Sequence, residues 1–242
     1  MKNFIIFLFI YLVSFSLFSQ IVSDRPDQTE SAIVLVNGNF QIESGFIFEN
    51  KKLESEENLT ILNNLFRIGI LKGLEFRVNT NIITELNDSS ESKKVFFSDL
   101  EIGTKIQILN KQSKNTKIAF LTHYIVPSSL IGTSESSGLI NRLLISHDIS
   151  QDYQLSYNIG YNKYFNFNYD EIIYTISFAR SFKKFGIYFE IFGIESINIS
   201  KFNWDTGVTY EVNNNLQIDF AKVKGFNNDL NYITLGICWL FS

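Results

Sequence analysis

Histidine, cysteine and serine, the side chains most often used for nucleophilic or metal chemistry, form no obvious site in this 242-residue sequence. His123 and His147 are the only histidines, and neither has a partner at a zinc-binding spacing. A serine nucleophile would need Ser146 or Ser150 beside His147. Residues one or three apart in a strand point to opposite faces, so neither pair can form the required hydrogen bond. The sequence therefore predicts no catalytic residue, no metal site and no cofactor.

Charged side chains form a clearer pattern, because they alternate with apolar ones. In residues 203–211, Asp205 and Glu211 alternate with Trp204 and Val208. A period of two indicates strands with one apolar and one polar face. Seven of ten such charged residues are acidic, which predicts an interior of negative potential that prefers cations. The ten predicted lumen-lining residues are Glu43, Arg67, Glu75, Arg77, Glu101, Lys105, Glu190, Asp205, Glu211 and Asp219.

The whole chain divides into twelve segments of this kind, and the links between them tend to alternate between long and short. Long links are expected at 49–59, 86–94, 128–138, 195–202 and 224–230. Bacterial outer-membrane barrels have an even strand count, short periplasmic turns and longer external loops. The predicted strands are 39–48, 60–70, 74–85, 95–108, 116–127, 139–149, 153–165, 171–181, 185–194, 203–211, 216–223 and 231–241.

The two ends of the chain favour a membrane barrel over a soluble sandwich. Lys2 precedes an apolar run from Phe4 to Phe18, which predicts a signal peptide cleaved near Ser19 or Gln20. The alternative, a membrane anchor, needs about 20 apolar residues, and this run is shorter. The last strand, 231–241, is apolar and aromatic on one face and resembles the assembly signal of bacterial outer-membrane barrels.

The predicted fold is therefore an all-β, twelve-stranded antiparallel up-and-down transmembrane β-barrel. Residues 1–20 are the signal peptide, 21–38 an N-terminal periplasmic or plug segment, and 39–242 the barrel. The expected location is the outer membrane of a Gram-negative bacterium, with outer-membrane lipids and, during biogenesis, the barrel assembly machinery as partners. A net charge of -4 without a basic run gives no reason to expect nucleic acid. The single Cys238 cannot form an internal disulfide.

The segment 21–38 contains the only dense charge pattern outside the strands. Asp24, Arg25, Asp27 and Glu30 fall within seven residues. About fifteen residues separate Ser23 from the first strand, enough to reach into a barrel mouth roughly 24 Å wide. The segment is either a plug or a flexible leader that serves assembly.

The plug hypothesis predicts specific ion pairs. Arg25 is expected to pair with an inward carboxylate near the periplasmic end, such as Glu211 or Asp219. The expected partners of Asp24, Asp27 and Glu30 are Arg67, Arg77 or Lys105.

Several stretches match the pattern of one family. They are Ser23-Asp24-Arg25-Pro26-Asp27-Gln28-Thr29-Glu30-Ser31 with Gly38-x-Phe40-Gln41-x-Glu43-x-Gly45, Asp99-Leu100-x-Ile102-Gly103-x-Lys105, Ile125-Val126-Pro127, and Asp205-x-Gly207-x-x-Tyr210-x-x-x-x-Asn215-x-Gln217-x-Asp219 with Gly236. These residues resemble the transporter-like outer-membrane proteins of the putative MetA-pathway of phenol degradation family. Pro127-Ser128-Ser129 departs from the proline, threonine and glycine common there.

The resemblance implies an outer-membrane channel or transporter for small molecules, with hydrophobic or aromatic solutes among the candidates. It supplies neither a substrate nor a catalytic residue. Two other functions remain open: a non-conducting structural or partner-docking barrel, and an outer-membrane lipid hydrolase.

Overall fold

The computed structural model describes residues 21–52, 56–87, 92–97, 100–110, 115–127, 137–165, 167 and 169–242. The predicted signal peptide, 1–20, lies outside these residues. No helix capable of crossing a bilayer occurs in the part of the chain that the structure describes.

The described chain is built from antiparallel strands that follow the alternation of the sequence. Their bounds are β1 (Phe40–Lys52), β2 (Glu56–Leu71), β3 (Leu74–Asn87), β4 (Ser92–Phe97), β5 (Leu100–Asn110), β6 (Thr116–Val126), β7 (Gly138–Asp148), β8 (Tyr153–Tyr164), β9 (Asp170–Phe182), β10 (Phe185–Ser196), β11 (Ile199–Asn213), β12 (Leu216–Gly225) and β13 (Asn231–Phe241).

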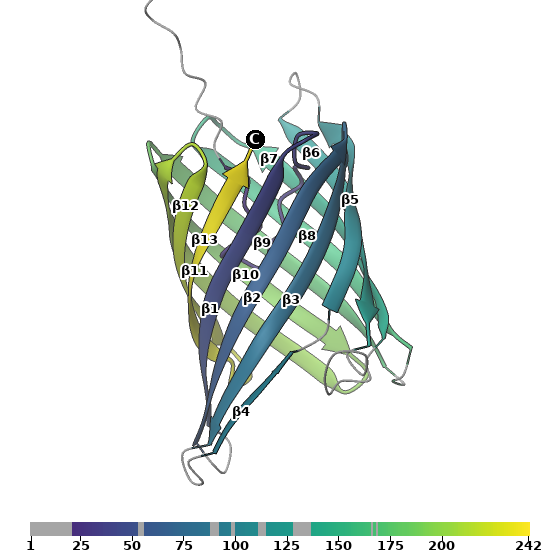
Figure 1. The fold of residues 1–242 in the computed structure, drawn as a ribbon, viewed down its shortest axis with the longest axis vertical. Coiled ribbons are helices and arrows are strands. Elements are labelled where there is room, and N and C mark those ends of the chain that lie inside the picture. The colour runs from purple at the N-terminus through teal and green to yellow at the C-terminus, as the bar shows by residue number, and fades with distance from the viewer. Residues whose placement is uncertain are drawn as a thin grey trace, which may run out of the picture.

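The strands close into a barrel (Figure 1). Each pairs with its neighbours in chain order, and β1 pairs with β13 from Phe40 opposite Phe241 onward. β4 and β5 both pair with β3 and occupy one position in the wall. The barrel therefore has the twelve strand positions predicted from the sequence, with the fourth predicted strand, 95–108, divided in two. Closure pairs the backbone N–H and C=O groups of the edge strands, which would find no water to bond inside the bilayer.

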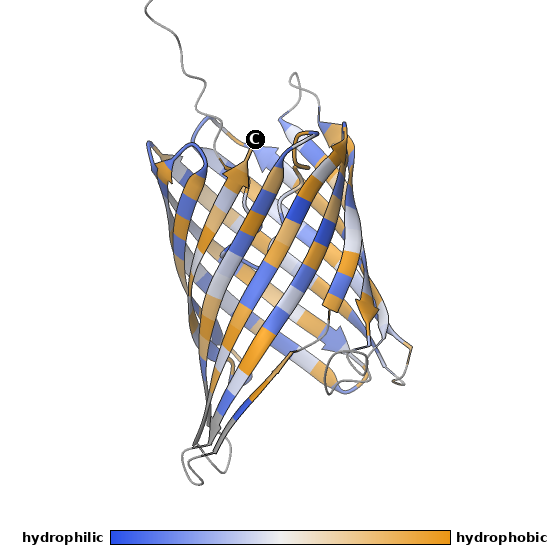
Figure 2. Ribbon diagram, viewed as in Figure 1, coloured by the Kyte–Doolittle hydropathy of each residue, from blue (hydrophilic) through white to orange (hydrophobic). Residues whose placement is uncertain are grey.

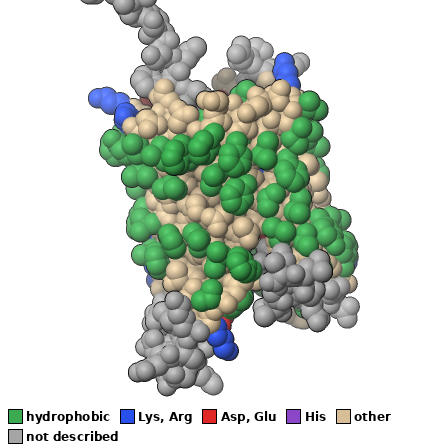
Figure 3. Space-filling model, in the orientation of Figure 1, with side chains coloured by type: hydrophobic (Ala, Val, Ile, Leu, Met, Phe, Trp, Pro, Cys, Tyr) green, Lys and Arg blue, Asp and Glu red, His purple; other side chains and the backbone are tan. Residues whose placement is uncertain are grey.

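The outer surface of the barrel is apolar and the inner surface polar. Phe46, Ile176, Phe189, Leu235 and Trp239 are among the large apolar side chains exposed on the outside. Figure 2 shows hydropathy alternating along the strands, and Figure 3 shows apolar side chains spread over the outer face. Such a surface is stable against lipid, so the protein resides in the bacterial outer membrane.

Several strands are longer than the sequence predicts. β10 and β11 are joined by only two residues, 197–198, where a long link over 195–202 was predicted. β1 continues to Lys52 and β2 begins at Glu56, which shortens the predicted link 49–59 as well. The prediction of these links was wrong because a strand ladder can continue beyond the bilayer into water. Alternation of apolar and polar side chains is not required there.

Candidate functional site

The segment 21–38 lies inside the barrel, at the end where β1 begins and β13 ends (Figure 1). The Gly38 N–H donates to the Gly69 carbonyl at 2.9 Å, and the Gly69 N–H donates to the Asn39 carbonyl at 3.0 Å. Gly69 lies on β2, and a Cβ there would lie 2.1 Å from the Val36 carbonyl oxygen. The absence of a side chain at Gly69 is therefore what lets the segment turn into the lumen.

The wall formed by β2, β3 and β5 carries Arg67, Arg77 and Lys105, and we call it the basic side. Arg67 and Arg77 face each other across the β2–β3 ladder. Like charges in opposite positions repel. Glu75 relieves part of this repulsion, because Arg67 donates to both of its oxygens, at 2.7 and 2.9 Å, and Arg77 donates to one at 2.9 Å. Glu43 accepts from Arg67 at 2.8 Å.

The segment supplies the remaining carboxylates. Asp24 Oδ2 accepts from Arg77 Nη1 at 2.6 Å and from Lys105 Nζ at 2.8 Å. Glu30 Oε2 accepts from Arg77 Nη2 at 2.8 Å. A buried charge without a partner costs far more than a paired one, so the wall and the segment depend on each other.

Arg25 crosses to the seam between the first and last strands. Its guanidinium lies 3.1 Å from Asp219 Oδ1 and donates to Thr234 Oγ1 at 2.8 Å. Gly45 and Gly236 face each other across β1 and β13, and a Cβ on either would lie within 2.4 Å of the Arg25 guanidinium. Two glycines thus form the seat of this side chain.

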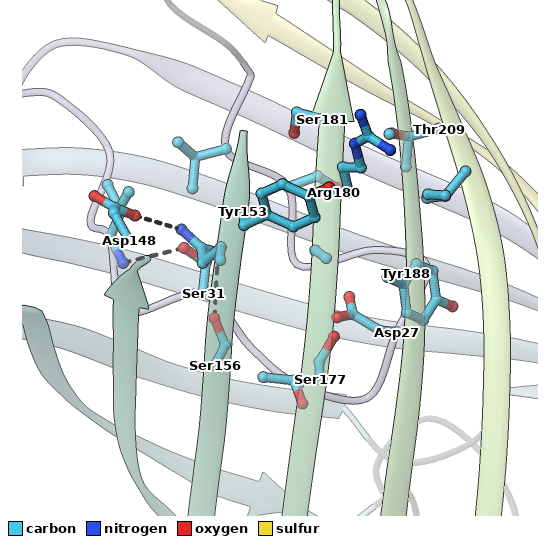
Figure 4. A pocket seen from close by; sticks show the side chains of 18 of the residues that line it. Asp27, Ser31, Asp148, Tyr153, Ser156, Ser177, Arg180, Ser181, Tyr188 and Thr209 are labelled. Carbon is cyan, nitrogen blue, oxygen red and sulfur yellow. Dashed lines mark hydrogen bonds between the residues drawn. The ribbon is translucent and has the colours of Figure 1, made fainter. Parts of the chain in front are cut away.

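Two predicted interactions of the segment are not found: that of Arg25 with Glu211 and that of Asp27 with the basic side. Glu211 interacts with the backbone of Ile21 and lies near Lys184, whereas Arg25 pairs with Asp219. Asp27 points away from the basic side and lies beside Ser177 and Tyr188 (Figure 4). The predicted pairing of Asp27 with Arg67, Arg77 or Lys105 is therefore wrong, because the chain bends over residues 26–29 and directs Asp27 to the opposite wall.

That opposite wall carries Glu190 on β10 and Asp205 on β11, and together with Asp27 we call it the acidic side. Glu190 and Asp205 are opposite each other in the ladder and both are fully buried. Glu190 accepts from the Gln28 N–H at 2.7 Å and from Thr29 Oγ1 at 2.5 Å. The three carboxylates form no ion pair with a described lysine or arginine.

The pKa values of the two aspartates of the segment are shifted in opposite directions. Burial pushes the pKa of Asp24 upward, but attraction by Arg67, Lys105 and Arg77 holds it well below its ordinary 3.8. For Asp27, burial and the nearby Glu190 carboxylate raise the pKa well above 3.8. Asp24 is thus held charged, and Asp27 favours its neutral form.

His123 belongs to the lumen network, a position that the sequence did not predict. Its Nε2 accepts from Arg77 Nε at 3.2 Å, which assigns the proton to Nδ1, 3.0 Å from Glu101. Gly103 gives the ring room. Both faces of β6 are largely apolar, so the alternation did not show which way His123 points.

An apolar patch inside the lumen also escaped prediction. Ala32 of the segment packs against Leu121 and Ala119 of β6 and against Leu144 of β7, all fully buried. The patch gives the segment a small hydrophobic contact just after its charged residues, Asp24 to Glu30.

The serine and histidine considered for a lipid hydrolase face different environments. Ser146 is buried in the lumen and accepts from Ser156 at 3.0 Å. His147 bonds Thr116 at 2.9 Å and Tyr157 at 3.1 Å. Among the described residues, no group of three or more histidine, cysteine, aspartate or glutamate side chains is arranged to hold a metal ion.

A cavity of about 700 Å³ remains between the segment and the walls of β6 to β12. It extends from the turn at Ser150 to Asp152 down to Asp27 and Tyr188 (Figure 4). Its lining is mostly hydroxyl, amide and charged side chains, including Ser156, Ser177 and Gln217. Near the rim, Gln154 donates to Asp148 at 2.9 Å, and Lys117 pairs with the same carboxylate at 2.5 Å.

Known structures share this architecture. The KdgM porin superposes with a TM-score of 0.63 at 10% identity, covering 84% of this chain and 99% of the porin. An outer membrane channel from Pseudomonas putida F1 gives 0.63 at 9% identity, with 86% and 97% covered. The NanC porin gives 0.59 at 10% identity, with 83% and 98% covered. At sequence identities this low, the superpositions establish a shared fold and nothing about function.

Sequence comparison is more specific. No curated protein matches the chain by sequence. The family described as "Putative MetA-pathway of phenol degradation" matches residues 23–236. This match begins at Ser23, in the segment that fills the lumen, and ends at Gly236, in the seat of Arg25. The chain therefore belongs to the putative MetA-pathway of phenol degradation family of outer-membrane barrels.

Proposed function

We propose that the protein is an outer-membrane channel for small solutes whose aperture is set by the segment 21–38. The observation that carries the proposal is the unequal filling of the lumen. On the basic side the segment is bound by charged hydrogen bonds, whereas on the other side a cavity of about 700 Å³ stays open to the end where β1 begins and β13 ends. That volume suits a small solute.

The polarity of the cavity favours polar solutes over hydrophobic or aromatic ones. Hydroxyl and amide groups would have to lose water to an apolar guest without a replacement hydrogen bond. The acidic residues that have no cationic partner favour cations, as the sequence predicts. A reversal potential measured in a salt gradient tests this preference, and anion selectivity would contradict it.

Deletion of residues 24–30 tests the role of the segment. The expected result is larger or more frequent current steps in planar bilayers, with barrel assembly unchanged. The deletion protein leaves Arg67, Arg77 and Lys105 without two of their carboxylates, so its folding is checked by its resistance to denaturation in detergent. Unchanged conductance in a folded deletion protein would rule the plug out.

A non-conducting structural barrel is the second candidate, and the tight seating of the segment favours it. Absence of current steps, together with absence of solute uptake into liposomes, would support that role. We do not propose lipid hydrolysis, because Ser146 bonds Ser156 inside the lumen whereas His147 bonds Thr116 and Tyr157. A refolded protein that hydrolyses phospholipid, and loses this activity in His147→Ala, would overturn that choice.

The wider partners follow from the fold. Outer-membrane lipids surround the barrel, and the assembly machinery that inserts such barrels is the expected partner during biogenesis. The apolar, aromatic C-terminal strand β13 supports this expectation.

A further inference from the structure

A cavity of about 610 Å³ opens on the outer surface of the wall, at the end opposite the segment 21–38. It lies where β8 ends, β9 begins and β10 ends, and we call it the external cavity. Short turns join the strands at the end that holds the segment, so the opposite end faces the exterior of the cell. The external cavity is therefore separate from the proposed channel.

Aromatic rings form one part of its lining. Phe167 and Tyr169 both line the external cavity, and their ring centroids lie 5.5 Å apart. Both rings contact Tyr164, at centroid distances of 6.2 and 5.5 Å, and the Tyr164 hydroxyl donates to Glu171 at 3.0 Å. Aromatic side chains are common where a barrel meets the membrane surface, so the rings alone do not indicate a ligand.

Polar atoms of the same lining do indicate one. The Ser196 hydroxyl oxygen, on β10, is buried and has no hydrogen-bond partner among the described residues. Asp170 accepts from Lys163 Nζ at 2.9 Å and from the Tyr161 hydroxyl, both through Oδ2, and it lies near the backbone of Tyr164. Because a carboxylate has about four acceptor positions, at least one on Oδ1 stays open. Buried polar atoms are ordinarily satisfied, so a bound molecule would supply what these two lack.

The charges of the lining disfavour an ionic ligand. Lys163 pairs with Asp170, whereas Glu195 accepts from Ser200 at 2.9 Å and from Tyr174 at 3.5 Å. A cation would meet the Lys163 ammonium, and an anion would meet two carboxylates. The ligand that fits is therefore neutral and both donates and accepts hydrogen bonds.

The lining also requires an apolar face on the ligand. Ile172 and Ile197 line the external cavity beside the rings, and Ile197, in the turn between β10 and β11, is 81% exposed. A sugar in the pyranose form combines both properties. Its hydroxyls donate and accept, and its ring C–H groups form a face that packs against the negative face of an aromatic ring.

We propose that the external cavity binds a neutral pyranose sugar. Its C–H face packs against Phe167 and Tyr169, and its hydroxyls bond to Asp170 and Ser196. The volume suits a mono- or disaccharide. The site lies on the outer surface, so the proposal goes beyond the channel function and does not depend on it.

The test uses the mature protein folded in lauryldimethylamine oxide, a detergent without sugar, and methyl β-D-glucopyranoside as the probe. Saturation-transfer NMR should show saturable binding, with the strongest signals on the ring C–H groups. Glycerol has hydroxyls but no ring face, and choline is a cation. Each should bind at least about threefold more weakly than the glucoside.

Two variants locate the site. Tyr169→Ala should weaken glucoside binding by about two- to tenfold, because an aromatic contact is lost. Ser196→Ala should weaken it by a similar factor through loss of one hydrogen bond. The Ser196 hydroxyl has no partner among the described residues, so a purely structural role predicts unchanged affinity. Tyr124→Ala is the matched control, because Tyr124 is an exposed tyrosine of β6 outside the external cavity, and its affinity should be unchanged.

Three results would overturn the proposal: no saturable binding to the native protein, choline or glycerol binding as tightly as the glucoside, or unchanged affinity in either folded variant. The same titration in nanodiscs identifies the source of the sugar. Weaker glucoside binding when lipopolysaccharide is present identifies a glycolipid headgroup as the occupant, and unchanged binding identifies a free saccharide. Both results support the site.

Discussion

The basic side and the acidic side of the lumen hold the same segment by opposite means. On the basic side, the wall carries two arginines and a lysine, and Asp24 and Glu30 of the segment form ion pairs with them. On the acidic side, Asp27 joins two carboxylates of the wall that already repel each other. Two aspartates of one short segment thus have opposite effects: Asp24 stabilises docking at one wall, and Asp27 opposes it at the other.

Asp24→Asn should have the largest effect, because it removes the carboxylate shared by Arg77 and Lys105. Loss of one partner of a buried ion pair costs about 3–5 kcal/mol, so the segment should leave the lumen. Cys238 is the only cysteine, is fully buried, and lies beside Ser23 beneath the segment. Its rate of modification by a polar thiol reagent should rise by orders of magnitude, and an unchanged rate would show that Asp24 does not hold the segment.

The basic side and the acidic side should respond to pH in opposite ways. The docked pKa of Asp24 is lowered, so its contribution is complete at neutral pH and is lost as pH falls below 3.8, by up to about 1.4 kcal/mol per pH unit. The docked pKa of Asp27 is raised, so docking weakens as pH rises above 3.8. Conductance should therefore be smallest near pH 4 and larger on either side. A monotonic profile would contradict the opposition of the two sides.

Gly69→Ala tests the entry of the segment without changing any charge. The new Cβ would overlap the Val36 carbonyl, a backbone atom that cannot rotate away, and such overpacking costs about 1–3 kcal/mol. Labelling of Cys238 should become faster. Gly186→Ala is the control, since its Cβ would meet only the Thr209 hydroxyl, which can rotate, and equal labelling in the two variants would exclude a role for Gly69.

Asp27→Asn should have the smallest effect and the opposite sign to Asp24→Asn. The Asp27 carboxyl must give up its charge on docking and asparagine has no charge to lose, so docking should tighten by about 0.2–1 kcal/mol at neutral pH. Slower labelling of Cys238 than in the native protein is the expected observation. Faster labelling would mean that Asp27 holds the segment, and the comparison between the two sides would fail.

Much of the barrel could be predicted because lipid imposes a simple rule on its strands. Alternation over 203–211 predicts an inward Asp205 without any knowledge of its neighbours, and the Asp205 side chain is fully buried. Beyond the bilayer the rule no longer applies, and the link 195–202 was therefore predicted too long.

The lumen was less predictable because its contacts join distant parts of the chain. The charges of 21–38 could be read from the sequence, but which wall each one meets depends on how the backbone turns after Arg25. His123 needs Arg77 and Glu101, which only the strand register brings to it. The Ala32 patch escaped because Leu121 and Leu144 are inward residues of strands that are apolar on both faces.

The seat of Arg25 has a consequence for the order in which the chain folds. Gly45 and Gly236 become neighbours only when the first and last strands have met, and Asp219 and Thr234 are 194 and 209 residues away from Arg25. Contacts between such distant residues form late, because the intervening chain must first be ordered. The binding place of the segment therefore does not exist until the barrel has closed. Residues that precede every strand of the barrel in the chain are then the last to reach their positions, and their docking stabilises the pairing of β1 with β13.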